Sequence, residues 1–178
     1  LYGDNNNWFA CWAFWQLKYY GHQDVRIMNG GRIKWELDGK PLVETKTEVD
    51  SVSYVAKEPN ESLRAYRDQI LKDLSESGMS LVDVRSPDEY NGLLLAPENV
   101  PQEGSQRAGH IPGAKNIPWA QATDSDGTFK SYAELLQLYT DNGITGEGNT
   151  VTWRTRVTNE LIRTELIARE EDAVTHAV

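Results

Sequence analysis

The amino-acid sequence predicts an α/β fold with an open, mostly parallel sheet flanked by helices. Short apolar segments alternate along the chain with segments of helical periodicity. Residues 79–85 (MSLVDVR) also form the continuous apolar run that is typical of a strand buried on both faces of a parallel sheet. Ligands of such sheets bind at the carboxyl ends of the strands. Three segments have this geometry, and they follow Asp4, Arg85 and Trp153.

The first part of the chain predicts two short strands and two helices. Residues 1–2 end a strand, and a polar loop with three asparagines, any of which can cap a helix, leads into a helix over residues 8–20 that stops at Gly21. Residues 25–29 form a second strand, and a short helix then closes at Asp38-Gly39. The first helix is predicted to bury one face, made of Trp8, Cys11, Trp12, Trp15 and Tyr19.

The second part of the chain follows a polar connector at residues 43–60. An amphipathic helix over residues 62–74 is predicted from apolar positions at helical spacing: Leu63, Tyr66, Ile70 and Leu74. The remaining predicted elements follow in chain order: a strand at 79–85, a helical turn at 86–90, a long loop at 93–107, a short strand at 114–119, a helix that Ser131 and Glu134 cap, and a strand at 149–153. The tail after Arg154 has a mostly helical pattern.

The composition limits the class of protein. With 178 residues, 39% of them hydrophobic, the chain has enough apolar surface for one medium domain or two incomplete ones. The net charge of −9 argues against nucleic acid or an anionic membrane surface as the main partner. A single cysteine, Cys11, excludes an internal disulfide and a multi-cysteine metal site, and it suits a reducing, cytoplasmic location. The chain opens with Leu1 and not Met, at the end of a predicted strand, so we expect a fragment or a chain that has lost its start. The first residues do not have the pattern of a signal peptide.

Three motifs carry a family resemblance: LVDVRSPDEY, RAGHIPGAKNIPW and MNGGRIKW. Together they resemble the two-domain rhodanese family of thiosulfate sulfurtransferases, and the fold expected is a rhodanese-like open sheet in two incomplete domains. Residues 1–42 resemble the C-terminal half of the non-catalytic domain, and residues 43–78 the interdomain connector with its helix. Residues 79–153 resemble the N-terminal half of the catalytic-type domain, and residues 154–178 form a divergent tail.

The resemblance implies sulfane sulfur transfer without a cofactor. A cysteine thiolate takes sulfur from thiosulfate, a small sulfur-containing anion, and passes it to a thiophilic acceptor. That cysteine opens a loop after a buried strand, where backbone N–H groups stabilise anionic sulfur. Here Arg154, Thr155, Arg156 and Val157 follow the strand, with neither cysteine nor glycine. We therefore expect a chain that appears truncated, lacks the catalytic cysteine and is inactive as written.

Several residues lie near the expected site by resemblance. Asp83 and Arg85 are interpreted as a structural ion pair at a strand end. Glu89 stands where some family members, including mercaptopyruvate users, carry a substrate-binding arginine, so its carboxylate weighs against that substrate. His110 is expected to hydrogen-bond its own turn, although its pKa range also suits acid–base chemistry. Arg107, with Arg154 and Arg156, can gather around an anion or be solvated surface.

Two other residues concern the first domain. Asp4 takes the place of the reactive cysteine by resemblance, where it cannot carry sulfur and is expected to cap the next helix. Cys11 is expected to be a small buried residue in mid-helix, not a nucleophile. No metal ligand set is predicted.

Two questions remain open from the sequence. A non-catalytic rhodanese-like binding or regulatory module is the alternative to a sulfurtransferase, whereas an active phosphatase of the same fold is excluded by the missing cysteine. The two half-domains are expected to stay separate. The competing hypothesis is that they pair as a circular permutant, with residues 1–2 and 81–84 in one sheet and Asp4 at the vacant loop position.

Overall fold

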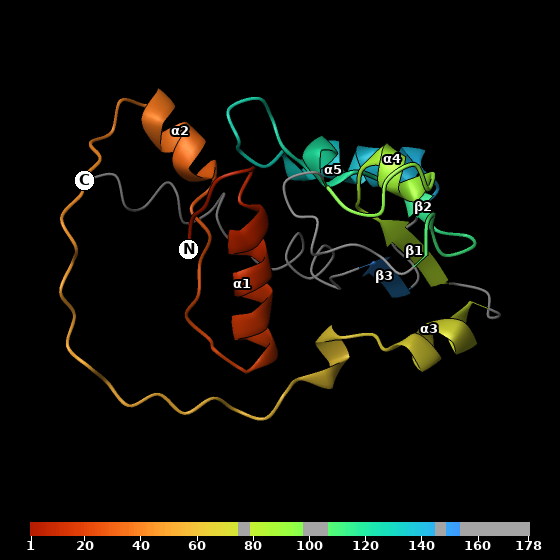
Figure 1. The fold of residues 1–178 in the computed structure, drawn as a ribbon, viewed down its shortest axis with the longest axis horizontal. Helices are drawn as coiled ribbons and strands as arrows, with labels where there is room; N and C mark the ends of the chain where they lie inside the picture. Colours follow the sequence, from red (N-terminus) through yellow and green to blue (C-terminus); the bar gives the residue numbers. More distant parts are fainter. Residues whose placement is uncertain (75–78, 98–106, 145–148, 154–178) are drawn as a thin grey trace. The chain divides into compact units, whose positions relative to one another are not determined.

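The structure, a computed structural model, describes residues 1–74, 79–97, 107–144 and 149–153, the last segment and residue 79 by backbone alone. The chain divides into two compact units. The first unit comprises Leu1–Ser62 and Thr123–Phe129, and the second comprises Leu63–Ala122 and Lys130–Val178. Figure 1 shows the elements in chain order.

The second unit contains a three-stranded parallel sheet in the order β2-β1-β3. β1 (Met79–Asp83) lies in the centre, between β2 (Lys115–Asn116) and β3 (Asn149–Trp153). The sequence prediction of a parallel α/β sheet is therefore confirmed, and all three strands lie within segments predicted as strands.

The core of this unit lies on both faces of β1. Successive strand residues point to opposite faces. Leu81 therefore joins Ala114 and side chains that include Ile70 and Leu74, whereas Val82 packs with a second group. That group is formed by Ile117, Tyr139 and Ile144. Helix α3 (Arg67–Asp73) thus covers one face of the sheet and α5 (Tyr132–Asp141) the other, as Figure 1 shows.

Two helices of the second unit begin with reciprocal capping contacts. The N-cap serine Ser131 of α5 accepts a hydrogen bond from the Glu134 N–H, and the Glu134 carboxylate accepts from the Ser131 N–H at 2.9 Å. Ser86 and Glu89 repeat this arrangement at α4 (Pro87–Tyr90). The cap predicted for α5 is confirmed, since each box satisfies N–H groups that have no partner within the helix.

The predicted helix over residues 62–74 is wrong in its first half. The structure has a 3-10 turn η1 (Glu61–Leu63), and α3 starts only after the extended residue Tyr66. The Asn60 Oδ1 atom accepts hydrogen bonds from the N–H and hydroxyl of Ser62, at 3.2 and 2.7 Å. This local turn competes with helix formation at Ser62, so that residue does not cap α3.

The first unit has helices α1 (Trp8–Tyr19) and α2 (Gly31–Leu37), and its described residues include no strand. The strands predicted at residues 1–2 and 25–29 are therefore not formed. Instead, the Leu1 amine donates to the Arg26 carbonyl at 2.6 Å, and the Met28 N–H donates to the Leu1 carbonyl at 2.8 Å. This contact is extended but too short to make a ladder.

The loop before α1 is organised by a buried asparagine. Asn5, Asn6 and Asn7 all have positive φ angles, a conformation that asparagine tolerates better than most residues. Asn7 is fully buried, and its Oδ1 accepts from the Gly3 N–H at 2.9 Å while its Nδ2 donates to the Met28 carbonyl at 2.8 Å. Its side chain links residues 3 and 28. The sequence prediction that an asparagine side chain caps α1 is therefore wrong for Asn7.

The buried face of α1 also differs from the prediction. Trp15 and Tyr19 are buried and stacked with ring centroids 5.4 Å apart, as expected. Ala10 and Phe14 are buried as well, whereas Trp12 is 54% exposed. The helix is apolar on most sides, so helical spacing alone does not identify the face that packs.

The connector contains no helix or strand in residues 43–60, which agrees with the sequence. It contacts the end of α1, where the Lys57 N–H donates to the Tyr20 carbonyl and the Asn60 N–H to the Tyr19 carbonyl. Within the described part of the chain, no helix has both the length and the apolar character needed to cross a bilayer.

The circular-permutant hypothesis is wrong for the described residues. Every strand of the sheet belongs to the second unit, and Leu1 contacts the backbone of Arg26 and Met28 instead of β1.

We predict that Asn7→Ala destabilises the first unit much more than Asn5→Ala. Both residues share the left-handed backbone, so both variants incur about 1 kcal/mol of strain. Asn7→Ala also leaves the Gly3 N–H and the Met28 carbonyl without a side-chain partner, which costs roughly 2–4 kcal/mol more. Chemical denaturation followed by tryptophan fluorescence measures both, and equal losses would contradict the role assigned to Asn7.

Candidate functional site

The carboxyl edge of the sheet is the candidate functional site. In the strand register, Asp83 at the end of β1 is the partner of Asn116 in β2 and of Trp153 in β3. The chain therefore leaves all three strands at one edge. The predicted catalytic position, Arg154, directly follows Trp153, but it lies outside the described residues, as does Arg156.

An ion pair fixes this edge. Asp83 is buried, and its carboxylate accepts from the Arg85 Nη2 at 2.6 Å and from the Arg85 Nε at 3.0 Å. The hydrogen bond to Asp83 raises the pKa of the Arg85 guanidinium above its usual value. Arg85 Nη2 also donates to the Gly109 carbonyl at 2.7 Å. The predicted structural bridge is thus present, and it holds the loop around Gly109 to the end of β1.

Asn116 secures the same edge from the neighbouring strand. Its Nδ2 donates to the Asp83 and Arg85 carbonyls, each at 3.0 Å. The Arg85 carbonyl, which lies beyond the end of β1, thereby gains a partner, and the Asp83 carbonyl gains a second one besides the Ile117 N–H. The sequence analysis did not identify Asn116. The sequence offers only its place in the strand predicted at residues 114–119, and its position beside Asp83 comes from the strand pairing.

Glu89 has a local structural role in addition to its charge. It is 5% exposed, and its Oε2 accepts from the Ser86 hydroxyl at 2.9 Å and the Ser86 N–H at 3.2 Å. The carboxylate contributes to raising the pKa of Arg85. A negative group therefore lies near Arg85.

His110 lies in a turn that Tyr90 organises. The two rings stack with centroids 3.7 Å apart and an interplanar angle of 7°. His110 Nδ1 is 2.9 Å from the Tyr90 carbonyl, which can only accept, so Nδ1 carries the proton. The Tyr90 hydroxyl donates to the Ala114 carbonyl at 2.8 Å. The predicted hydrogen bond within the turn of His110 itself is not the one found, because Nδ1 bonds the end of α4 instead. Arg107, earlier in the same loop, is exposed.

The corresponding loop in the first unit is occupied by Asp4. Its carboxylate is 73% exposed and lies 4.0 Å from the Arg32 Nε, which pairs more closely with Glu36 at 2.8 Å. The prediction that Asp4 caps α1 is wrong, because Asn7 occupies the N-cap position. The left-handed turn at residues 5–7 separates Asp4 from the helix.

Cys11 lies within α1 and cannot act as an activated thiol. Burial raises its pKa from the usual 9.0 to about 12. Reactive cysteines have the opposite environment, at helix N-termini or near cations. Cys11 is half-buried and not fully buried as the sequence predicted, and its surroundings do not favour a nucleophile. Among the described residues, no group of three histidine, cysteine or acidic side chains is placed to hold a metal ion.

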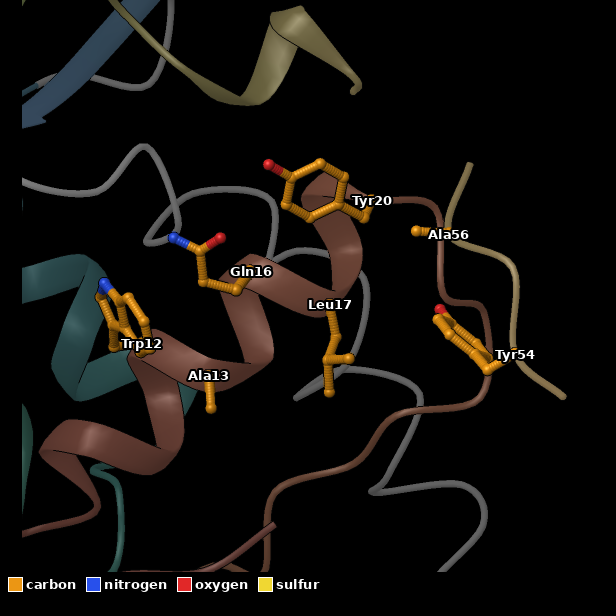
Figure 2. A pocket seen from close by; sticks show the side chains of 7 residues that line it. All are labelled: Trp12, Ala13, Gln16, Leu17, Tyr20, Tyr54 and Ala56. Atoms are coloured by element: carbon orange, nitrogen blue, oxygen red, sulfur yellow. The ribbon is translucent and has the colours of Figure 1, made fainter. Parts of the chain in front are cut away.

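A second concave feature lies along α1 in the first unit. Figure 2 shows this groove, of about 470 Å³, between the helix and the connector. Its lining is mainly apolar and consists of Trp12, Ala13, Gln16, Leu17, Tyr20, Tyr54 and Ala56. It contains no thiol, carboxylate or cationic side chain, so it offers no group for sulfur chemistry. Sequence reasoning missed Tyr54 because it lies in a polar connector.

Relatives of this chain are named for sulfur chemistry. A protein of Mycolicibacterium smegmatis, named "Putative thiosulfate sulfurtransferase", is 55% identical over 153 residues, covering 86% of this chain and 54% of the relative. The "Sulfur carrier protein TtuD" of Thermus thermophilus is 54% identical over 159 residues, covering 86% of this chain and 55% of the relative. The chain thus spans about half the length of these curated relatives.

Solved structures share the fold. The 3-mercaptopyruvate sulfotransferase SseA of Escherichia coli matches with a TM-score of 0.73 and 23% identity, over 96% of this chain and 61% of that one. The anaerobic ergothioneine biosynthesis enzyme of Chlorobium limicola matches with a TM-score of 0.65 and 24% identity, over 81% of this chain and 35% of that one. A profile described as "Rhodanese-like domain" matches residues 67–155, which is half of the sequence. The chain, with its parallel sheet and its Asp83–Arg85 pair at the carboxyl edge, therefore belongs to the rhodanese-like domain family.

Proposed function

We propose that this chain derives from a thiosulfate sulfurtransferase and carries the framework of its sulfur-transfer site without the reacting thiol. The observation that supports this proposal is the carboxyl edge of the sheet, where the ends of β1, β2 and β3 meet beside the Asp83–Arg85 pair. The names of the relatives favour thiosulfate as the donor.

The proposed reaction has two steps. A cysteine thiolate attacks the outer sulfur of thiosulfate, the bond between the two sulfur atoms breaks, and sulfite leaves with the electron pair. A thiophilic acceptor such as cyanide then takes the outer sulfur from the persulfide, and the thiolate is regenerated. Backbone N–H groups at the carboxyl edge of a parallel sheet suit this chemistry because they stabilise the anionic sulfur at no cost in reorganisation.

This chain has one thiol with which to perform that reaction, and it is unsuited. Cys11 is in the middle of α1, and at neutral pH burial keeps it protonated. The alternative function, a non-catalytic binding or regulatory module, is favoured by this same observation: the site edge is well built while the nucleophile is missing.

The chain is expected to show no thiosulfate:cyanide sulfurtransferase activity. Thiocyanate formation should stay at the level of a protein-free blank, because no thiolate is available at the carboxyl edge. A relative containing the catalytic cysteine provides the positive control. Turnover well above the blank would contradict the proposed loss of activity and would exclude a purely non-catalytic module.

Cys11 is expected to be chemically inert while the chain is folded. Intact mass after thiosulfate treatment should show no added sulfur. With a pKa of about 12, the thiol should react with iodoacetamide at pH 8 at least about a hundredfold more slowly than in the denatured chain. A sulfur adduct on Cys11, or equal alkylation rates, would overturn its assignment as an unreactive, half-buried thiol.

The raised pKa of Cys11 also predicts an alkaline effect on stability. The folded state keeps a proton on Cys11 that the unfolded state loses above pH 9.0. The contribution of the protonated thiol to the free energy of unfolding is therefore complete below pH 9.0 and is lost as pH rises towards about 12. Cys11→Ala should lose less stability over that window than the parent chain. The same slope in both proteins, measured by denaturation at several pH values, would contradict the burial of the thiol.

Placing a cysteine after β3 is not expected to restore activity. Arg154→Cys supplies a thiol, but the residues that follow contain no glycine to shape a loop of converging N–H groups. We expect activity at least about a hundredfold below that of an intact relative, since loss of such donors costs roughly 3 kcal/mol. Near-normal thiocyanate formation by this variant would contradict the argument.

A further inference from the structure

A short hairpin is seated on the turn that precedes α2. Thr123 and Phe129 form an antiparallel bridge, and the Asp124 N–H donates to the Thr128 carbonyl at 2.8 Å. We call residues Thr123–Phe129 the 123–129 hairpin. They belong to the first unit, although Ala122 and Lys130 on either side belong to the second.

A side chain of the first unit recognises the hairpin backbone. The Phe129 N–H donates to the Asn29 Oδ1 at 2.8 Å, across a hundred positions of sequence. The sequence analysis identified the MNGG motif around Asn29 only as part of a family resemblance. In the structure, the Asn29 side chain accepts a hydrogen bond from the hairpin backbone.

The two backbones approach so closely that glycine is required on the hairpin side. A Cβ atom at Gly127 would lie 2.9 Å from the Gly30 carbonyl oxygen, and Gly127 has a φ angle of +82°. Gly30 has a φ angle of +81°, and a Cβ there would lie 3.2 Å from the Thr128 side chain. A contact distance below 3.0 Å to a backbone atom allows no side chain, so the hairpin fits this turn only through Gly127.

Hydrogen bonds within the hairpin fix its conformation. The Asp126 carboxylate accepts from the Thr128 hydroxyl at 2.6 Å and from the Thr128 N–H at 3.1 Å. These bonds lower the pKa of Asp126, and the nearby Lys34 ammonium adds to that effect. At the neck, the Lys130 N–H donates to the Ala122 carbonyl at 3.0 Å, so the two sides of the hairpin leave together.

We propose that the 123–129 hairpin is a clasp, bound by the Asn29–Gly30 turn, that couples unfolding of the first unit to unfolding of the chain on either side of the hairpin. The chain passes between the units at Ser62–Leu63 and at the two flanks of the hairpin, Ala122–Thr123 and Phe129–Lys130. The contacts that seat the hairpin hold it to the first unit, in addition to the covalent connection through the polar connector at residues 43–60. Releasing the hairpin costs free energy, and that cost then opposes the unfolding of either unit.

Three single variants of the full chain test the clasp. Asn29→Ala removes one hydrogen bond and inserts no atoms, so it retains the fold. Gly127→Ala adds a clash with Gly30. Gly113→Ala is the matched control, because Gly113 has a φ angle of +84° and open space around the added Cβ.

Amide hydrogen exchange provides the direct measurement. We expect exchange at Phe129 to rise roughly tenfold or more in Asn29→Ala and in Gly127→Ala, with no such rise in Gly113→Ala. Combining Asn29→Ala with Gly127→Ala should raise exchange little beyond Gly127→Ala alone, since the hairpin is already released. An unchanged rate at Phe129 in Asn29→Ala, or equal effects of the two glycine variants, would overturn the seating.

Exchange as a function of denaturant tests the coupling. In the parent chain, amides of α1 and of α5 should lose protection at the same denaturant concentration. In Gly127→Ala and Asn29→Ala, protection in α1 should be lost first. Separate transitions in the parent chain, or coincident transitions in both variants, would show that the hairpin does not couple the units.

Discussion

The central position of β1 is the constraint on which the second unit depends. Leu81 and Val82 are adjacent in sequence and nearly inaccessible to solvent, yet they face opposite sides of the sheet. Both faces must therefore be covered, and α3 and α5 provide the two layers. Burial of this kind stabilises each side chain by roughly 1.5–3 kcal/mol. Because β1 is paired on both edges, its carboxyl end at Asp83 is fixed in position.

The chemistry of the site edge follows from that fixed end. Asp83 is a buried carboxylate, and a buried charge requires a partner. Arg85 provides that partner two residues later, and its Nη2 also donates to the Gly109 carbonyl. The same arginine therefore holds the loop at Gly109 to the end of β1. Asn116 completes the edge from β2. The three contacts hold together the ends of β1 and β2 and the segment at Gly109.

The first unit is held together by a different kind of interaction. It has no ladder in its described residues, and its order comes from single polar side chains that bind backbone groups. Asn7 links Gly3 to Met28, and Asn29 binds Phe129. Each asparagine connects segments that are distant in sequence, and each replaces contacts that a sheet would otherwise supply. Much of α1 remains exposed, including Phe9 and Trp12.

The sequence by itself determined the elements whose signals are local. The apolar run of β1, the Ser131–Glu134 capping box and the glycine after α1 act within a few residues, so the parallel α/β class and the Asp83–Arg85 pair were predictable. The lone Cys11 was likewise recognised as unsuited to act as a nucleophile. Only the tertiary structure decided which face of α1 packs, that Asn7 binds backbone groups and does not cap, and that residues 123–129 seat against Gly30. Those outcomes depend on groups that are brought together from distant positions, and the spacing of residues along one segment does not encode them.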